Sequence, residues 1–404
     1  MSRQSNGAGT GPRVVIASAA RTPIGSYGRS LSGVPATELG AIAARAAIAR
    51  SGLEPRQIDH VVFGNVVHTA TEDMYMARVV GMKSEVPQEV PAFTVNRLCG
   101  TGVQAIVSAA QAIQAGEADV VLAGGAESMS RGPYWVPSGR WGARMGEQRL
   151  VDPVIGGLTD PFHDILMGVT AENLAAEKAI GRDEQDAFAV ESHRRAVAAQ
   201  GAGFFDAEIV SVPVRTKDGP GAFERDEHLR PDASLEAMAK LPPIFKADGG
   251  TVTAGNASGM NDAGAAVVLV DERRAAQLGV KPRARILSSA SCGVDPRVMG
   301  IGPVPAVRRA LDRAGVSLDE VGVIELNEAF AAQALAVIAD LDLDPAKVNP
   351  NGGAIALGHP IAASGAVITA KILAEMERGD HELGLVTLCI GGGQGIAMLL
   401  ERTA

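Results

Sequence analysis

Aromatic residues are scarce in this chain, making up only 3% of its 404 residues, whereas glycine occurs 48 times. A core with so few large rings has to be built from small aliphatic side chains that pack closely. Hydrophobic residues at 46% and charged residues at 21% are nevertheless typical of a globular protein. The length predicts two or three domains.

The chain also lacks an excess of positive charge, since its formal net charge is −9. We therefore expect no nucleic-acid partner and no attraction to an anionic membrane surface. Apolar runs of transmembrane length are missing, and residues 1–12 are polar and glycine-rich rather than signal-like. These absences favour a cytoplasmic protein without a membrane partner.

Cysteine is rare as well, with Cys99, Cys292 and Cys389 as its three occurrences. The spacing predicts neither a disulfide framework nor a metal site, which fits a reducing cytoplasm. Cys292 lies in SSASCGVDP, which matches no motif, and is interpreted as structural. The histidines other than His359 fall in predicted loops or on polar faces and are expected to be solvated.

Cys99 lies in the most informative stretch, VNRLCGTG at residues 95–102. Val90–Val95 before it predicts a short buried strand. A helix is predicted just after it, from apolar residues at helical spacing: Val103, Ile106, Val107, Ala110 and Ile113. Glycines and a helix N-terminus favour a thiolate over a thiol. A small cysteine packed beneath the helix is the alternative.

Strands and helices alternate in the first half of the chain. A buried strand is expected at Arg13–Ala19, followed by a helix that Thr37 caps and Gly52 ends. Another buried strand is expected at Asp119–Ala123, closed by Gly124-Gly125. This alternation predicts βα units around a mainly parallel sheet and an α/β fold class.

The second half repeats the first after an insertion. Residues 130–250 change in character and predict an inserted subdomain with one clear helix at Gln185–Gln200. Beyond it, three glycines recur at one offset, because 315 − 52, 365 − 102 and 379 − 116 are each 263. The chain is therefore predicted to be an internal duplication, with halves at residues 1–281 and 282–404.

Residues that can carry chemistry fall at matching places in the two halves. His359 ends the glycine-rich stretch NGGAIALGHP, and Cys389 begins CIGGGQG. Asn327 follows a predicted strand in ELNEAFA. A pseudo-twofold arrangement would bring these groups and Cys99 to one crevice at the carboxyl ends of strands.

The stretches NRLCGTG, NEAFAAQA, NGGAIALGHP and CIGGGQG resemble the thiolase family of acetyl-CoA acyltransferases, and the likeness runs along nearly the whole chain. It implies a duplicated fold of two βαβαβαββ halves in αβαβα layers, with an inserted loop domain. It also implies thiolytic cleavage of 3-ketoacyl-CoA by CoA in fatty acid or ketone metabolism, or the reverse condensation of acetyl-CoA. CoA would be a substrate, no cofactor would be permanently bound, and the assembly would be a homotetramer.

The resemblance also implies a role for each motif residue. Cys99 matches the nucleophile that becomes the acyl-thioester, and His359 matches the base that activates it. Asn327 would hold a water that, with His359, stabilises one thioester oxyanion. Cys389 matches the acid/base that acts at the α-carbon of the second acetyl group. The backbone N–H groups of Cys99 and Gly391 would stabilise the other oxyanion.

CoA is expected to lie over the inserted subdomain. By resemblance, Arg230 would contact the nucleotide part and Ser258 the pantetheine. The remaining expected contacts are apolar residues of the channel, Leu158, Met167, Leu241, Ala254 and Phe245, together with Phe330 in the acyl pocket.

Two positions depart from the family pattern. Ala362 replaces the usual glycine after the histidine motif, which would shift that loop if the position needs a positive φ. Leu166 replaces a histidine that is common in short-chain members, which predicts a broader, short- to medium-chain β-ketothiolase.

Two alternatives stay open at this point. A ketoacyl-synthase-type condensing enzyme would share the fold, although it would not use a cysteine at the position of Cys389. A catalytically silent, thiolase-like scaffold that binds CoA would retain the fold without turnover.

Overall fold

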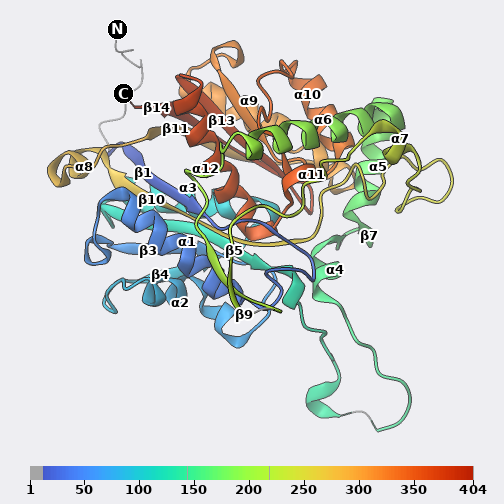
Figure 1. Cartoon of the computed structure of the whole chain (residues 1–404), viewed down its shortest axis with the longest axis horizontal. Helices are drawn as coiled ribbons and strands as arrows, with labels where there is room; N and C mark the ends of the chain where they lie inside the picture. The colour runs from blue at the N-terminus through green and yellow to red at the C-terminus, as the bar shows by residue number, and fades with distance from the viewer. Residues whose placement is uncertain (1–11, 143, 218, 404) are drawn as a thin grey trace.

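A mixed ten-stranded sheet dominates the computed structural model, which describes residues 12–142, 144–217 and 219–403 (Figure 1). The polar segment predicted at residues 1–12 lies outside the described residues except for Pro12. The strand order is β12-β13-β14-β11-β1-β10-β5-β3-β4, with β2 paired to β10. The strands are β1 (Val14–Arg21), β2 (Gly25–Ser26), β3 (His60–Gly64), β4 (Ala92–Val95), β5 (Val120–Ser128), β10 (Asn261–Asp271), β11 (Ala284–Gly293), β12 (Val323–Leu326), β13 (Leu383–Ile390) and β14 (Gln394–Arg402).

The sheet consists of two half-sheets that meet at a short seam. Only Val15–Arg285 and Ile16–Ala284 pair across it, between β1 and β11. Within the halves, β3–β4, β3–β5 and β12–β13 are parallel, whereas β5–β10, β1–β10, β11–β14 and β13–β14 are antiparallel. The prediction of a mainly parallel sheet is therefore wrong. Continuous apolar runs usually mark parallel strands, but here helices cover the antiparallel strands on both faces too.

Helices form three layers around the half-sheets. In the middle lie α3 (Thr101–Gln114) and α12 (Ile361–Arg378), which pack with residues of β5, β10, β13 and β14 in one core. On the outer face of the N-terminal half-sheet lie α1 (Ala36–Ser51) and α2 (Met76–Lys83). On the outer face of the C-terminal half-sheet lie α9 (Pro303–Ala314) and α10 (Ala331–Leu341). This gives the layered, duplicated α/β fold that the resemblance implied.

The two middle helices touch at equivalent glycines of the two halves. A Cβ on Gly102 would lie 2.5 Å from the Ala366 nitrogen, and one on Gly365 would lie 2.3 Å from the Val103 nitrogen. Since 365 − 102 and 366 − 103 are both 263, the contact is reciprocal. The approach at these two positions is too close for any side chain.

A hydrogen bond outside the middle layer also recurs in both halves, with acceptors 263 residues apart and donors 270 residues apart. The Ser18 hydroxyl donates to the Ala47 carbonyl at 2.6 Å, and the Ser288 hydroxyl donates to the Ala310 carbonyl at 2.6 Å. Each serine lies beside a register shift of its strand, β1 or β11. The structure thus supports the internal duplication inferred from the glycine spacing.

Residues between β5 and β10 carry their own small elements. They are α4 (Pro153–Gly157), β6 (Thr159–Asp160), β7 (Ile165–Leu166), α5 (Met167–Lys178), α6 (Arg182–Gly201), β8 (Val212–Thr216), β9 (Gly219–Phe223) and α7 (Leu235–Ala239). The predicted helix at Gln185–Gln200 lies within α6, whereas α5 was missed. Ahead of α4, the chain runs out from the body as a long arm, on which Trp141 is 88% exposed (Figure 1).

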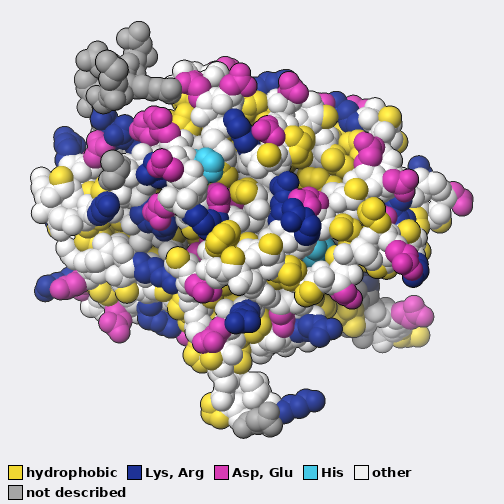
Figure 2. All heavy atoms as spheres, turned by 45° about the horizontal axis from the view of Figure 1, so that its top comes forward, with side chains coloured by type: hydrophobic (Ala, Val, Ile, Leu, Met, Phe, Trp, Pro, Cys, Tyr) yellow, Lys and Arg dark blue, Asp and Glu magenta, His cyan; other side chains and the backbone are white. Residues whose placement is uncertain are grey.

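Two shorter helices, α8 (Glu272–Leu278) and α11 (Ala354–Leu357), complete the set. No helix in the described ranges is both long enough and apolar enough to cross a bilayer. On the face seen in Figure 2, Lys and Arg side chains alternate with Asp and Glu, so no area of one sign stands out.

Several local predictions need correction. Thr37 does not cap α1, because the N-cap residue is Pro35, two residues earlier. The strand before Cys99 is not buried: β4 is an edge strand, and Phe93 on it is 44% exposed. β5 does not stop at Gly124, where a Cβ would lie 2.2 Å from the Ala265 carbonyl oxygen. That glycine reflects close strand packing rather than a turn.

The prediction for the remaining histidines is also wrong in part. His193 on α6 is buried, and burial, together with the nearby His228 and Arg230, lowers its pKa to about 4. Cys292 is buried in the outer core of the C-terminal half, as a structural role requires.

The glycine contact between the middle helices can be tested by mutation. Gly102→Ala should lower the melting temperature, because forcing a methyl group into a filled contact costs about 1–3 kcal/mol. Gly201→Ala is the matched control, since a Cβ at this helical position meets no atom within 4 Å. Calorimetry that finds equal melting temperatures for both variants would contradict the close helix contact.

Candidate active site

Cys99 lies on a tight turn directly before α3. It is the middle residue of η3 (Leu98–Gly100), and Leu98 adopts a left-handed φ of 48°. Two side chains hold the turn: Asn96 accepts a hydrogen bond from the Leu98 N–H, and Thr101 accepts one from the Arg97 N–H. The backbone conformation is therefore fixed locally, and the thiol is presented at the start of the helix.

The thiol of Cys99 is not a resting thiolate. Burial raises its pKa to about 11, although hydrogen bonds from the backbone N–H groups of Gly391 and of Cys99 itself act in the opposite direction. The expectation that the helix N-terminus favours a thiolate is therefore wrong for the free protein. Desolvation outweighs the helix and its N–H groups.

Cys389 and Gly391 approach Cys99 from the C-terminal half. Cys389 is fully buried near the end of β13, and burial together with the Cys99 charge raises its pKa. Gly391 follows β13 directly, and its N–H reaches the Cys99 sulfur. The two thiols therefore share one site, as predicted. A third contact holds the Cys99 turn against the end of β13, because a Cβ on Gly100 would lie 2.5 Å from the Ile390 side chain.

His359 is buried and electrically neutral. Its Nδ1 is hydrogen-bonded to the Ser364 hydroxyl at 2.6 Å, and its backbone N–H donates to Asn261 Oδ1 at 2.9 Å. Burial lowers the pKa of the imidazole to about 4. Nε2 is buried without a hydrogen-bond partner among the described residues, so it is available to accept a proton.

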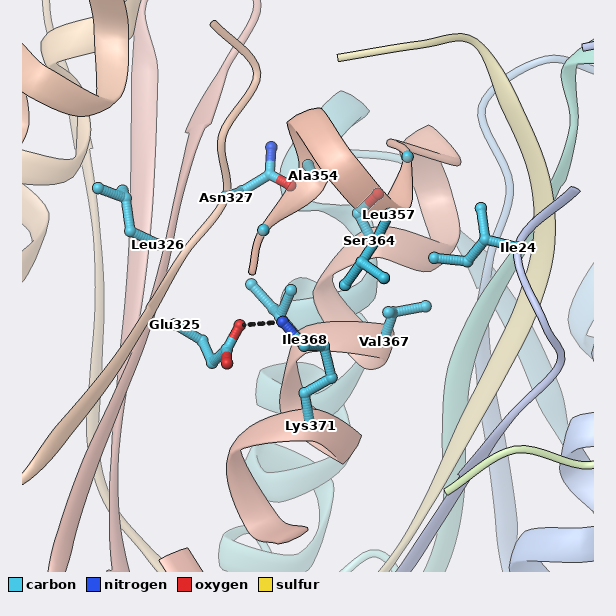
Figure 3. A pocket seen from close by; sticks show the side chains of 12 residues that line it. Ile24, Glu325, Leu326, Asn327, Ala354, Leu357, Ser364, Val367, Ile368 and Lys371 are labelled. Atoms are coloured by element: carbon cyan, nitrogen blue, oxygen red, sulfur yellow. Dashed lines mark hydrogen bonds and ion pairs between the residues drawn. The ribbon is translucent and has the colours of Figure 1, made fainter. Parts of the chain in front are cut away.

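Asn327 lies on the loop after β12, beside a small internal cavity (Figure 3). Its Nδ2 and Oδ1 are both buried, and neither has a partner among the residues that the structure describes. The cavity measures about 10 Å³, and Ser364 lines its far side. This is close to the smallest volume that holds one water molecule. An unpaired carboxamide beside such a volume fits the water that the resemblance assigned to Asn327.

A larger cavity of about 230 Å³ opens beside Cys99. Leu98, Gly391, Met167 and Phe162 are among the residues that line it. Its walls are mainly apolar, so it suits an extended thioester with an uncharged chain.

The predicted CoA contacts fall into two groups. Met167, Phe330 and Phe245 form one apolar cluster with Cys389, and Leu158 packs in a neighbouring cluster with Cys99. The Ser258 N–H donates to the Ala329 carbonyl, next to Phe330. The other residues do not share a cluster with either thiol. Arg230 and Ala254 are exposed, and Leu241 packs beside Ile355 and Met238.

Three site residues were missed from the sequence: Ser364, which orients His359; Asn261, which holds the His359 backbone; and Glu127, whose charge acts on Cys99. Glu127 stands in GGAESMS, and Asn261 follows TVTAGNASGM, so both lie in or next to glycine-containing stretches outside the four motifs that carry the resemblance. Ala362 is buried at the start of α12 and does not have a positive φ. The condition under which its methyl group would shift the histidine loop is therefore not met.

These groups can perform acyl transfer chemistry. A thiol beside two backbone N–H groups can attack a thioester, since those donors can stabilise the oxyanion that forms. A neutral imidazole can accept the thiol proton, and a second thiol can move a proton at a neighbouring carbon.

The chain is similar in sequence to one family of known proteins along nearly its whole length. The family model described as "Thiolase, N-terminal domain" matches residues 14–273 of the chain, and the model described as "Thiolase, C-terminal domain" matches residues 280–402. The chain is 56% identical to Beta-ketothiolase BktB of Cupriavidus necator over 96% of its own length and 99% of that protein. It is 50% identical to an acetyl-CoA acetyltransferase of the same organism, again over 96% of this chain and 99% of that protein.

Solved structures agree with the sequence relatives. Human mitochondrial 3-ketoacyl-CoA thiolase superimposes with a TM-score of 0.95 at 46% identity, covering 97% of this chain and 99% of that one. The same human enzyme in complex with CoA gives a TM-score of 0.94 at 45% identity, covering 97% and 98%.

The neutral state of His359 predicts an unusual pH dependence. Because its pKa is lowered to about 4, the imidazole should stay a competent base as the pH falls from 8 to 5. The single-turnover rate of Cys99 acetylation by acetyl-CoA should therefore lose half its value only near pH 4. A midpoint near 6.5, the ordinary histidine value, would contradict this environment.

Proposed function

Since this chain belongs to the thiolase family, we propose that the candidate active site carries out the family reaction with the residues described above. The protein is an acyl-CoA:acetyl-CoA C-acyltransferase. It cleaves a 3-ketoacyl-CoA with CoA, or condenses acetyl-CoA in the reverse direction, through a cysteine acyl-enzyme. The observation that supports this assignment most directly is the placement of Cys99, Cys389 and the Gly391 N–H at one site.

In the acyl-transfer step, Cys99 Sγ attacks the thioester carbonyl carbon while its proton passes to His359 Nε2. The raised pKa of the thiol and the lowered pKa of the imidazole mean that both partners start neutral. Charge then develops only as the carbon–sulfur bond forms. Collapse of the tetrahedral intermediate breaks the bond to the CoA sulfur, which leaves as the thiol after taking the proton from His359.

In the carbon–carbon step, Cys389 exchanges a proton with the α-carbon of the second acetyl group. In the condensing direction, His359 first takes the thiol proton of Cys389, and the Cys389 thiolate then removes the proton from the α-carbon. The resulting enolate attacks the acyl carbon, and the bond to Cys99 Sγ breaks as that sulfur takes the proton back from His359. We assign one oxyanion to the backbone N–H groups of Cys99 and Gly391, and the other to His359 with a water on Asn327. Loss of one such donor costs roughly 3 kcal/mol of transition-state stabilisation.

The alternatives are not favoured. A ketoacyl-synthase-type enzyme would not place a thiol at the position of Cys389, yet Cys389 lies beside Cys99. A silent scaffold would not need an oriented base, yet Ser364 holds His359 with Nε2 unpaired.

CoA is proposed to reach the thiols through the cavity of about 230 Å³. Met167 lines this cavity, and the edge-to-face rings of Phe245 and Phe330 lie in the same apolar cluster as Met167. Leu158 and Ser258 would border the pantetheine. Arg230, Leu241 and Ala254 would lie toward the nucleotide, away from the thiols.

The protein is proposed to form a homotetramer in the cytoplasm. The long arm carries Tyr134, Trp135, Trp141 and Met145, all exposed on a segment that leaves the body of the chain. Such apolar groups mark an interface. Three cysteines without a disulfide fit a reducing compartment. A monomeric mass by light scattering at micromolar concentration would contradict the assembly.

Separate roles for the two thiols can be tested by mass spectrometry. Cys99→Ala should abolish covalent labelling by acetyl-CoA, because the attacking sulfur is gone. Cys389→Ala should retain the added acetyl group, while overall condensation falls by orders of magnitude.

Thermal unfolding of both variants is the control, because two cysteines that only pack in the core would lose stability without this split. An acetyl group found on Cys389 of the wild-type protein, with Cys99 unmodified, would reverse the assignment.

The acyl pocket predicts a broad range of chain lengths. Leu166, at the start of α5, presents an apolar side chain beside the buried Met167. We therefore expect 3-ketopentanoyl-CoA to be cleaved at least a tenth as fast as acetoacetyl-CoA, a penalty under ~1.4 kcal/mol. Initial rates with the two substrates measure this ratio, and no turnover of the five-carbon substrate would contradict it.

A further inference from the structure

Glu127, near the end of β5, is a buried carboxylate that no step of the reaction above uses. Its Oε1 accepts hydrogen bonds from Asn65 Nδ2 and the Val67 N–H, both at 3.0 Å. Its Oε2 accepts a hydrogen bond from the Ala362 N–H at 3.1 Å. One side chain therefore joins the loop after β3 to the first turn of α12.

The internal duplication explains why this carboxylate lies where it does. With the offset of 263, Ala362 is the counterpart of Cys99, and Glu127 is the counterpart of Ile390, the residue before Gly391. At the end of β13 in the C-terminal half-sheet, the Gly391 N–H donates to the Cys99 sulfur. At the end of β5 in the N-terminal half-sheet, the Glu127 carboxylate accepts a hydrogen bond from the Ala362 N–H. Glu127 thus lies at the place in the N-terminal half that corresponds, by the duplication, to the candidate active site at the end of β13.

The first turn of α12 depends on this contact. No side chain next to the helix start caps it, so Glu127 supplies an acceptor for one of its free N–H groups. An anion there is also favoured by the helix dipole. The same turn includes Ser364, whose hydroxyl holds His359 Nδ1 at 2.6 Å. Glu127 therefore fixes the element that orients the imidazole.

Glu127 also lies close to Cys99. Val67, whose N–H it accepts, and Ile361, next to Ala362, pack in one apolar cluster with Cys99. The Glu127 charge raises the pKa of the Cys99 thiol. Among the other titratable groups, Asp73 acts on Glu127 through its charge, and the Cys99 charge acts on Cys389. The imidazole of His359, which takes the Cys99 proton in the proposed reaction, is neutral because burial lowers its pKa to about 4.

We propose that Glu127 is a positioning residue for acyl transfer: it anchors the start of α12, where Ser364 orients His359, and in its ionised form it opposes ionisation of the neighbouring Cys99 thiol. The proposal rests on the proposed function. In the attack, the thiol proton passes from Cys99 Sγ to His359 Nε2, and Glu127 itself exchanges no proton.

Glu127→Gln tests both parts of the proposal, the anchoring of α12 and the effect of the Glu127 charge on Cys99. Loss of the anchor should lower the rate of acetoacetyl-CoA cleavage, whereas loss of the charge should raise the rate of Cys99 alkylation. The amide has one acceptor oxygen and would turn an NH₂ group toward a donor, so α12 should loosen and acetoacetyl-CoA cleavage should fall about tenfold or more. Loss of the charge should raise the rate of Cys99 alkylation by iodoacetamide severalfold. Alkylation is measured at pH 9, above the pKa of about 8 to which burial raises Glu127. A purely structural role would not speed alkylation.

Three further variants sharpen the result. Ser364→Ala should lower turnover without faster alkylation, because it releases His359 and keeps the charge. Glu127→Asp should also lower turnover without faster alkylation, because the shorter side chain loosens the anchor and keeps the charge. It replaces Glu127→Gln if that variant fails to fold. Asp59→Asn removes a carboxylate that accepts two N–H groups at the opposite end of β5, and both readouts should stay at the wild-type level.

The proposal is overturned if turnover and alkylation of Glu127→Gln fall together, or if neither changes. Turnover by the wild-type protein separates this outcome from failure of the proposed function. A wild-type protein that does not cleave acetoacetyl-CoA contradicts the thiolase reaction, whereas the alkylation comparison still decides whether Glu127 restrains the thiol.

Discussion

The contact between α3 and α12 is the constraint on which the site depends. Gly102 and Gly365 let the two helix backbones meet, and each would place a Cβ within about 2.5 Å of the other helix. Cys99 lies just before α3 and His359 lies just before α12, so this contact joins the two helices that follow the proposed nucleophile and the proposed base. The half-sheets on either side then bring the ends of β5 and β13 to the two helix N-termini.

Burial governs the chemistry of the site more strongly than the helix dipole does. It raises the pKa of both catalytic thiols and lowers the pKa of His359 to about 4. The resting groups are therefore neutral, and in the proposed reaction charge develops only during the chemical steps. The backbone N–H groups of Gly391 and Cys99 act against this effect of burial at the Cys99 sulfur, and they are the donors that we propose for one oxyanion.

Much of this arrangement could be predicted from the sequence, because glycine positions record backbone contacts. The spacing of Gly102 and Gly365 predicted the duplication, and the two motif cysteines lie close enough for the Cys99 charge to act on Cys389. Strand direction could not be read, since β10 is buried on both faces and resembles a parallel strand. The thiolate prediction failed because desolvation depends on tertiary burial. Glu127 was missed as a site residue because its partners lie 60 to 235 residues away.

The most direct test of the account is a crystal structure of the Cys389→Ala variant soaked with acetyl-CoA, in which the second half-reaction is blocked. The account predicts an acetyl group on Cys99 Sγ, with its carbonyl oxygen accepting hydrogen bonds from the N–H groups of Cys99 and Gly391. An unmodified Cys99 with acetyl-CoA in the cavity, or an acetyl oxygen directed at Asn327, would contradict it.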